Sequence, residues 1–377
     1  MSHTVYLDHN ATSPLKAEVK KAVIYAMEIE GNPSSVHGAG RKAKRLVEDA
    51  REQVRVAVNA PKSAQVIFTS CGTEANTLAL NGVNPVRVLA SATEHASVLG
   101  ARSDIESIPV DAFGRVDLGH LQTMLAAGDG HALVSVMMAN NETGVLQHIE
   151  DIAHLAHRFG ALVHVDGIQA LGKVNVDFLS LGIDMLSLSA HKIGGPLGVG
   201  ALIASKDVKL QASNRGGGQG GGLRGGTENV SGISGFGVAA EIAKSELVGM
   251  QNVKALRDHL EAEIKAFAED ATVIADDVER LPNTSFISMA GVSAETQLMT
   301  MDLAGICVSA GSACSSGKSK SSLVLKAMGL GEDIAKTAIR VSLGHTNKKN
   351  DVDHFISAWK DLYQRQARKS QNNTAAV

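Results

Sequence analysis

Apolar and polar positions along this chain follow two periods. Short apolar runs typical of strands alternate with longer segments in which apolar residues recur every 3.6 positions. Strands are expected over residues 5–7, 65–69, 86–90, 132–138, 162–165 and 184–189. Helices are expected over residues 16–28, 38–59 and 149–159, and another should begin within residues 70–74. This alternation predicts an α/β fold around a mostly parallel sheet.

The pattern changes near Lys209. Residues 215–226 read RGGGQGGGLRGG, and their composition alone favours a flexible linker. Beyond them we expect helices over 230–246, 253–269 and 352–364, strands over 284–289, 306–309 and 339–343, and a frayed polar tail from Ala367. We therefore expect a large domain over residues 16–245. Residues 1–15 and 246–377 should form a smaller α+β domain.

Composition excludes several classes of protein. The 377 residues have a net charge of −3 and only 3% aromatic residues, which disfavours nucleic-acid binding. The three cysteines, Cys71, Cys307 and Cys314, form no C-x-x-C pair, so no permanent metal site is expected. We expect Cys71 and Cys307 to be small buried side chains. No signal peptide or membrane span is expected, and free thiols indicate the cytoplasm.

Charged residues follow two of the expected strands. Asp166 ends the run at 162–165, and His191 and Lys192 follow the run that ends at Ser189. A strand-end aspartate alone is commonly a helix cap, and a His-Lys pair alone is commonly a solvated turn. Together, with Gln169 between them, they indicate a Schiff-base lysine facing an acid that pairs with a pyridinium ring.

The same segment resembles a known family. The string SLSAHKIGGPLGVG is similar to the lysine region of aminotransferase class V, a fold-type I pyridoxal-phosphate group, and especially to the cysteine desulfurases. The resemblance extends from about Val5 to Gln364. It implies that Asp166 keeps the ring nitrogen protonated, that Gln169 contacts the ring oxygen, and that Ser189 and His191 contact the phosphate.

Further motifs resemble the segments of the family that contact the cofactor. The string TSCGTEAN resembles the phosphate loop of the family, which implies that Gly72 and Thr73 bind the phosphate. His95, in SATEHASV, matches a histidine that stacks on the ring and moves protons. Asn141, in MANNETGV, matches an asparagine near the ring and the substrate carboxylate.

The glycine-rich run leads into LRGGTEN at residues 223–229, which is similar to a segment that reaches the phosphate of the other subunit. Thr227 would take that role, so the resemblance implies a homodimer with shared active sites. Gly220 and Gly221 stand where many relatives have a charged pair, which leaves the local rigidity of this run open.

Cys314 lies among small polar residues in GSACSSG, which resembles the nucleophile loop of the desulfurases that have a long mobile loop. The resemblance allows transient iron–sulfur ligation by this cysteine. Lys318 and Lys320 depart from the family pattern. The segment also nearly spells a P-loop, but five residues separate Gly311 from Gly317 where the motif allows four, which disfavours nucleotide binding. Arg340, in AIRVSLGH, matches the arginine that binds the substrate carboxylate.

These residues together predict a cysteine desulfurase. It would release L-alanine from L-cysteine, leave a persulfide on Cys314, and pass the sulfur to an acceptor such as an iron–sulfur scaffold. Lys192 or His95 would move the α-proton. Alternatives are another class V enzyme, such as a selenocysteine lyase or an aminotransferase, and a non-catalytic protein that retains the fold.

Overall fold

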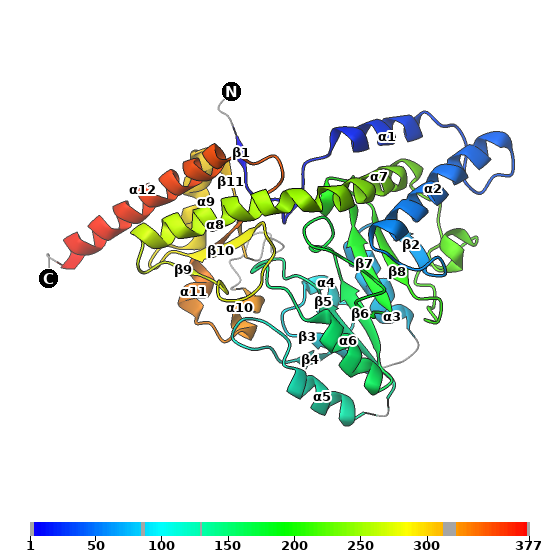
Figure 1. Ribbon diagram of the computed structural model, residues 1–377, viewed down its shortest axis with the longest axis horizontal. Coiled ribbons are helices and arrows are strands. Elements are labelled where there is room, and N and C mark those ends of the chain that lie inside the picture. The colour runs from blue at the N-terminus through cyan, green and yellow to red at the C-terminus, as the bar shows by residue number, and fades with distance from the viewer. Residues whose placement is uncertain (1–3, 84–86, 129, 312–321, 375–377) are drawn as a thin grey trace.

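The computed structural model describes residues 4–83, 87–128, 130–311 and 322–374. Within them the chain forms one large mixed sheet with helices on both faces, beside a smaller group of sheets and helices (Figure 1). The predicted Cys314 loop, with Lys318, Lys320 and most of the near-P-loop, lies outside the described residues.

The large sheet has seven strands in the order β2-β8-β7-β6-β5-β3-β4. It is parallel from β7 to β4, whereas β8 runs antiparallel to both of its neighbours. The predicted mostly parallel sheet is therefore confirmed. Its strands are β2 (Gln65–Thr69), β3 (Arg87–Ser91), β4 (Glu106–Ile108), β5 (Ala132–Met137), β6 (Leu162–Asp166), β7 (Met185–Ser189) and β8 (Gly200–Ala204).

Helices cover this sheet on both faces because alternate strand residues enter two different cores. Val66 and Phe68 of β2 pack in one core, and Ile67 between them packs in the other. The first core contains α2 (Gly38–Ala57), α5 (Leu118–Ala126), α6 (Ile149–Arg158) and α7 (Val230–Glu246), with Val19 of α1 (Ala17–Met27). The second contains α3 (Gly72–Gly82) and Val98 of α4 (Ala96–Leu99).

The sequence explains why α2 and α6 form where they do. Each turns an apolar stripe toward the first core, which in α2 includes the expected positions Val47, Ala50 and Val54. His37 caps α2 by accepting a hydrogen bond from the Gly40 N–H at 3.3 Å. Acidic residues in the first turn of α6 and basic residues in its last turn match the helix dipole.

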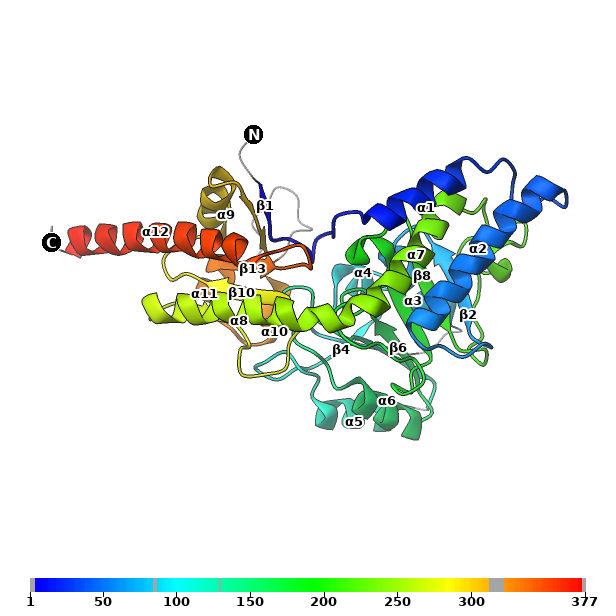
Figure 2. The ribbon, with the colours of Figure 1, turned by 45° about the horizontal axis from the view of Figure 1, so that its top comes forward.

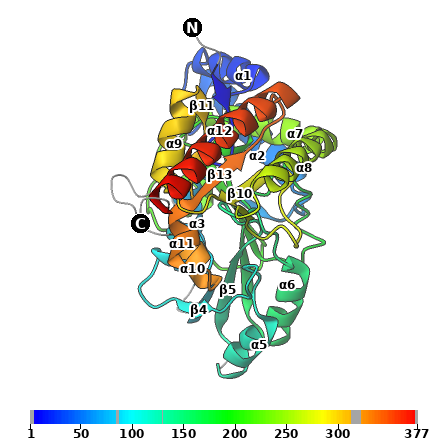
Figure 3. The ribbon, with the colours of Figure 1, turned by 90° about the vertical axis from the view of Figure 1, so that its left-hand side faces the viewer.

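The smaller part has its own core. A four-stranded sheet of order β12-β13-β10-β9 and the parallel pair β1-β11 pack against helices, with Phe355 and Trp359 fully buried. Figure 2 shows α12 extending away from the large sheet, and Figure 3 shows it nearest the viewer, between α9 and α8. The strands are β1 (Val5–Tyr6), β9 (Thr272–Val273), β10 (Thr284–Ser288), β11 (Ile306–Cys307), β12 (Ser309–Ala310) and β13 (Ala338–Ser342). The helices are α8 (Met250–Phe267), α9 (Ala294–Leu303), α10 (Leu323–Ala327), α11 (Glu332–Thr337) and α12 (Lys349–Thr374).

Several details differ from the sequence predictions, and β4, β8 and α5 were not expected at all. The single strand expected at 306–309 divides at Val308, because β11 pairs with β1 and β12 pairs with β13 in another sheet. The tail expected to fray from Ala367 instead continues α12 to Thr374. The domain boundaries at 15/16 and 245/246 stay a prediction, although α7 ends at Glu246 and a short 3-10 turn (Leu247–Gly249) precedes α8.

Candidate active site

One cavity of about 480 Å³ lies where β5, β6 and β7 end. Met137, Asp166 and Ser189, the last residues of these three strands, all line it. This is the edge at which open α/β sheets bind ligands. The structure brings to it nearly every residue singled out from the sequence: Gly72, Thr73, His95, Asn141, Asp166, Gln169, Ser189, His191, Lys192 and Arg340.

Lys192 lies in a short 3-10 turn, Ala190–Ile193, that ends at Gly194 in the left-handed conformation with φ 75°. A side chain at position 194 would also meet Lys16, so this sharp turn needs glycine. The Lys192 amine donates to the main-chain carbonyls of Asn10 at 2.6 Å and Ala11 at 2.8 Å. The N-terminal segment therefore orients the amine at the cavity wall.

Asp166 is buried at the end of β6. Its carboxylate accepts hydrogen bonds from the Ile168 N–H at 3.0 Å and from Asn76 Nδ2 at 2.8 Å. Burial raises the pKa of Asp166, while these two donors and the nearby His95 and Lys192 oppose the rise. A buried acid in this state is stabilised in its charged form by a cationic N–H that enters the cavity.

His95 caps α4 and faces the same cavity. Its Nδ1 accepts a hydrogen bond from the Ser97 N–H at 3.1 Å, so the neutral ring carries its proton on Nε2. Burial lowers the pKa of His95, and the charge of Lys192 lowers it further, against the opposing effect of Asp166. Asn76 Nδ2 links the two groups, because it donates to Ser97 Oγ as well as to Asp166.

The start of α3 and the end of β7 form the expected phosphate end of the cavity. A Cβ at Gly72 would lie 2.3 Å from the Ile168 side chain, so the close approach there excludes larger residues. Ser189 Oγ is buried without a hydrogen-bond partner, a costly state that an anion in the cavity would relieve. Burial and the charge of Lys192 lower the pKa of His191 to about 4.

Arg340 reaches the cavity from β13. It is 2% exposed, and its Nη1 donates to the Asn141 main-chain oxygen at 2.9 Å. Its Nη2 pairs with Asp8 at 2.8 Å. This places a guanidinium on the side of the cavity that the smaller part of the chain supplies.

Thr227 does not line this cavity. It lines a separate one of about 160 Å³ with Arg224, whose guanidinium pairs with Glu74 near the start of α3. The glycine-rich run before Thr227 folds back on itself. Gly218 and Gly220–Gly222 have positive φ, and Gly216 packs tightly against Gly225. The shared-site role of Thr227 stays a prediction.

Sequence patterns missed several residues that organise the cavity. Asn10 accepts from Lys192 and Gln169 through its main-chain oxygen, and Glu142 is a buried acid whose Oε2 accepts from Ser322 Oγ at 2.5 Å. Burial raises the pKa of Glu142. The expectation that Cys71 is buried is wrong, because this residue precedes α3 and lines the cavity; Cys307 is also only partly buried.

The described residues contain no group of His, Cys, Asp and Glu side chains that could hold a metal ion. None of the helices in the described part of the chain is both long and apolar enough to span a membrane.

Comparisons with known proteins agree with this geometry. The family model of aminotransferase class V matches residues 5–355. A cysteine desulfurase from Cereibacter sphaeroides is 44% identical over 366 residues, covering 93% of this chain and 94% of the relative. The cysteine desulfurase NifS of Azotobacter vinelandii is 39% identical over 367 residues, covering 93% and 90%. The structure of a NifS-like protein from Rickettsia africae superposes with a TM-score of 0.90 at 38% identity, covering 96% of this chain and all of that one.

Proposed function

This chain belongs to the cysteine desulfurases of aminotransferase class V, and we propose that it removes sulfur from L-cysteine with pyridoxal 5'-phosphate as cofactor. The observation that carries the proposal is the meeting of Lys192, Asp166 and Arg340, from distant parts of the sequence, around one cavity of about 480 Å³. A cofactor-holding amine, an acid for the ring and an anchor for a substrate carboxylate are the groups that this reaction needs.

The residues present fit the cofactor. The partnerless Ser189 hydroxyl, with His191, Gly72 and Thr73, supplies the phosphate end, and the buried Asp166 supplies the acid for the ring nitrogen. Gln169 would donate to the ring oxygen. When bound, pyridoxal phosphate withdraws electrons from the α-carbon of the substrate.

The chain's own residues divide the remaining work. Arg340 and Asn141 would bind the substrate carboxylate, and Asp166 would hold a proton on the ring nitrogen. Lys192 or His95 would move the α-proton, and burial, which lowers the pKa of His95, favours the neutral ring that can accept one. The Cys314 thiolate would then attack the sulfur of L-cysteine. That sulfur ends as a persulfide on Cys314, and the carbon skeleton leaves as L-alanine.

Sulfide and alanine release from L-cysteine, followed with the absorbance spectrum of the same sample, tests this proposal. Cys314→Ser should keep the yellow bound cofactor and lose sulfide release in the presence of a thiol reductant. Cys307→Ser is the matched control, because Cys307 lies on β11 and does not line the cavity. Undiminished sulfide release by Cys314→Ser would rule out the persulfide route and favour another class V reaction, such as a selenocysteine lyase.

The homodimer with shared sites belongs to the same proposal, with Thr227 reaching the phosphate bound by the other subunit. Subunit mixing tests it. Lys192→Ala and Thr227→Ala proteins should each be impaired, and mixed dimers should regain activity because one of their two sites receives an intact Lys192 and an intact Thr227. Mixed dimers without any recovery would contradict shared sites.

We further propose that the persulfide sulfur passes to an acceptor protein such as an iron–sulfur scaffold. The cytoplasm suits this transfer, since it keeps thiols reduced. Transfer of ³⁵S from labelled L-cysteine to a purified scaffold, absent with Cys314→Ser, would support this step. Equal labelling with the variant would contradict it.

A further inference from the structure

Lys173 is a buried amine that the proposed reaction leaves unused. It lies four residues after Gln169, in the turns that connect β6 to β7, and it is 7% exposed. Its Nζ donates to Gln169 Oε1 at 2.6 Å and to Asn10 Oδ1 at 2.8 Å. None of the described carboxylates forms an ion pair with it. Burial first, then the charges of Lys192 and Arg340, lower the pKa of Lys173 well below its usual value.

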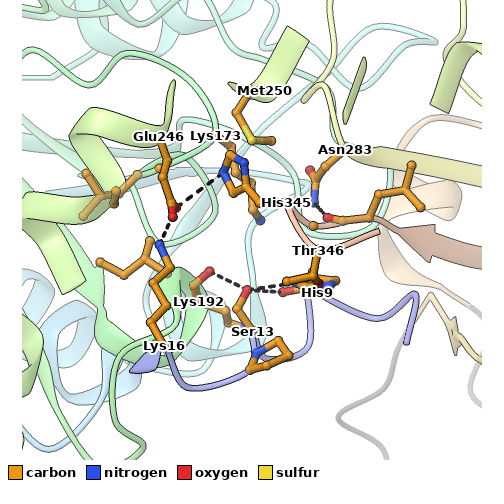
Figure 4. A pocket seen from close by; sticks show the side chains of 17 residues that line it. His9, Ser13, Lys16, Lys173, Lys192, Glu246, Met250, Asn283, His345 and Thr346 are labelled. Atoms are coloured by element: carbon orange, nitrogen blue, oxygen red, sulfur yellow. Dashed lines mark hydrogen bonds and ion pairs between the residues drawn. The ribbon is translucent and has the colours of Figure 1, made fainter. Parts of the chain in front are cut away.

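Lys173 stands behind the wall of the main cavity. It does not line that cavity, but it lines a smaller one of about 150 Å³ together with Lys192, His9 and His345 (Figure 4). A molecule bound in the main cavity would therefore meet Gln169 and Asn10, which line it, and not Lys173. The hydrogen bonds of Lys173 can affect such a molecule only through these two residues, while its charge also acts directly on Lys192.

The contacts of Gln169 fix the orientation of its amide. The Lys173 amine donates to the oxygen, and the Asn10 main-chain carbonyl, which can only accept, receives Nε2 at 2.9 Å. Turning the amide over would place its nitrogen against the Lys173 donors and its oxygen against a carbonyl. One N–H of Nε2 is used by Asn10, and the second has no other acceptor among the described residues, which leaves it for the cavity.

Asn10 is held in the same way. Its side-chain oxygen accepts from Lys173 at 2.8 Å and from Asn283 at 3.1 Å, and its main-chain oxygen accepts from Lys192. Lys173 thus supports both the amide that faces the cavity and the carbonyl that orients the Lys192 amine.

We propose that Lys173 is a positioning residue, which turns an N–H of Gln169 toward the cofactor ring oxygen and holds Asn10 against Lys192. This inference rests on the proposed function, because only a ring with an acceptor oxygen makes use of the oriented amide. A methionine at this position would fill similar space but donate no hydrogen bond.

The test measures pyridoxal-phosphate affinity and the pH dependence of the visible absorbance of the loaded protein. Lys173→Met should bind the cofactor ~10-fold more weakly, the effect of losing about 1.4 kcal/mol of interaction, and its absorbance titration should be displaced from that of the unmodified protein. Lys173→Gln should restore part of both properties and leave a several-fold loss, because its amide keeps N–H donors without adding a buried charge beside Lys192 and Arg340. If Lys173→Met does not fold, Lys173→Gln is compared directly with the unmodified protein.

Lys16→Met is the matched control. Lys16 lines the same small cavity but pairs with Glu246, so cofactor affinity and absorbance should stay unchanged. In a Gln169→Ala background, Lys173→Met should displace the absorbance titration much less than it does alone, since its effect on the ring oxygen acts through the amide.

Unchanged affinity and absorbance in Lys173→Met, or an equal displacement in the Gln169→Ala background, would overturn the inference. Failure of the unmodified protein to bind pyridoxal phosphate would instead overturn the proposed function.

Discussion

Asp8 Oδ1 lies 2.8 Å from Nη2 of Arg340, 332 positions along the chain. Asp8 also accepts from Ser309 Oγ at 2.7 Å, so three segments of the smaller part meet at one carboxylate. The guanidinium is nearly fully buried, and this is its one acidic partner among the described residues. Asp8 therefore fixes the direction in which Arg340 presents its remaining N–H groups to the cavity.

Asp8→Asn should raise the KM for L-cysteine and leave kcat much less affected. The substitution removes a charge-assisted hydrogen bond of about 1.5–3 kcal/mol, which corresponds to ~10- to 100-fold in kcat/KM. Steady-state alanine release measures both parameters. Asp104→Asn is the control, since Asp104 pairs with Arg102 at the surface and is 64% exposed. A fall confined to kcat would contradict the positioning of Arg340 by Asp8.

Ser189→Ala separates cofactor binding from folding. The Ser189 hydroxyl is buried without a partner, so its removal should leave the melting temperature of the cofactor-free protein unchanged or slightly higher. Pyridoxal-phosphate affinity should fall ~10-fold, because one hydrogen bond to a charged oxygen is lost. Calorimetry and a binding titration give the two values. An unchanged affinity would show that the phosphate lies elsewhere.

Asp166→Asn should retain bound cofactor and lose catalysis. Lys192, Ser189 and His191 remain to hold the cofactor, but the charge that stabilises a protonated ring nitrogen is gone. We expect sulfide release to fall ~100- to 1000-fold, as when one preorganised electrostatic group is removed.

The matched control for this change is Glu94→Gln. Burial and the neighbouring Asp166 raise the pKa of Glu94 well above its usual value, which favours its neutral form. Replacing it by a neutral amide should change activity less than about threefold. An equal fall in sulfide release in both variants would contradict the proposed role of the Asp166 charge.

His164 makes stability depend on pH. It is buried between Ser135 Oγ and Ser187 Oγ, and burial lowers its pKa from 6.5 to about 3. Between those values the unfolded chain binds a proton that the folded chain does not, so the free energy of unfolding falls as the pH falls. One such group contributes a slope of about 1.4 kcal/mol per pH unit.

His164→Gln should reduce this slope, as measured by urea unfolding of the cofactor-free protein between pH 6 and 4.5. His120→Gln is the control, because the His120 side chain is 65% exposed. A slope that stays the same in His164→Gln would mean that other groups dominate the loss of stability in acid.

The sequence alone could place Asp166 and Lys192 together for a general physical reason. Both follow apolar runs, and the carboxyl ends of parallel strands meet at one edge of a sheet. The strands β2, β6 and β7 and the helix α7 were predicted within a residue or two, because their apolar periods are locally complete. The error at 306–309 has the opposite cause. There the strand divides because its two halves pair with different sheets, which a local pattern cannot predict.

No local pattern could predict Asn10 or Lys173. Asn10 reaches the cavity because β1 pairs with β11 and the Asp8–Ser342 bridge ties the N-terminal segment to β13. Lys173 reads in the sequence as an ordinary surface lysine after a glycine. Its burial becomes apparent only when Asn10 and Gln169 are seen to receive its hydrogen bonds.

The pairing of the first strand with β11, and of Asp8 with Ser342, has a consequence for synthesis on the ribosome. Residues that orient the Lys192 amine are translated first, but the strands that hold them are translated last. A nascent chain can complete the large sheet early and still lack an ordered lysine until β13 has emerged. Premature termination before Ser342 would therefore yield a polypeptide that lacks the contacts orienting the Lys192 amine, and it should hold its vitamin-derived coenzyme less tightly than the finished enzyme.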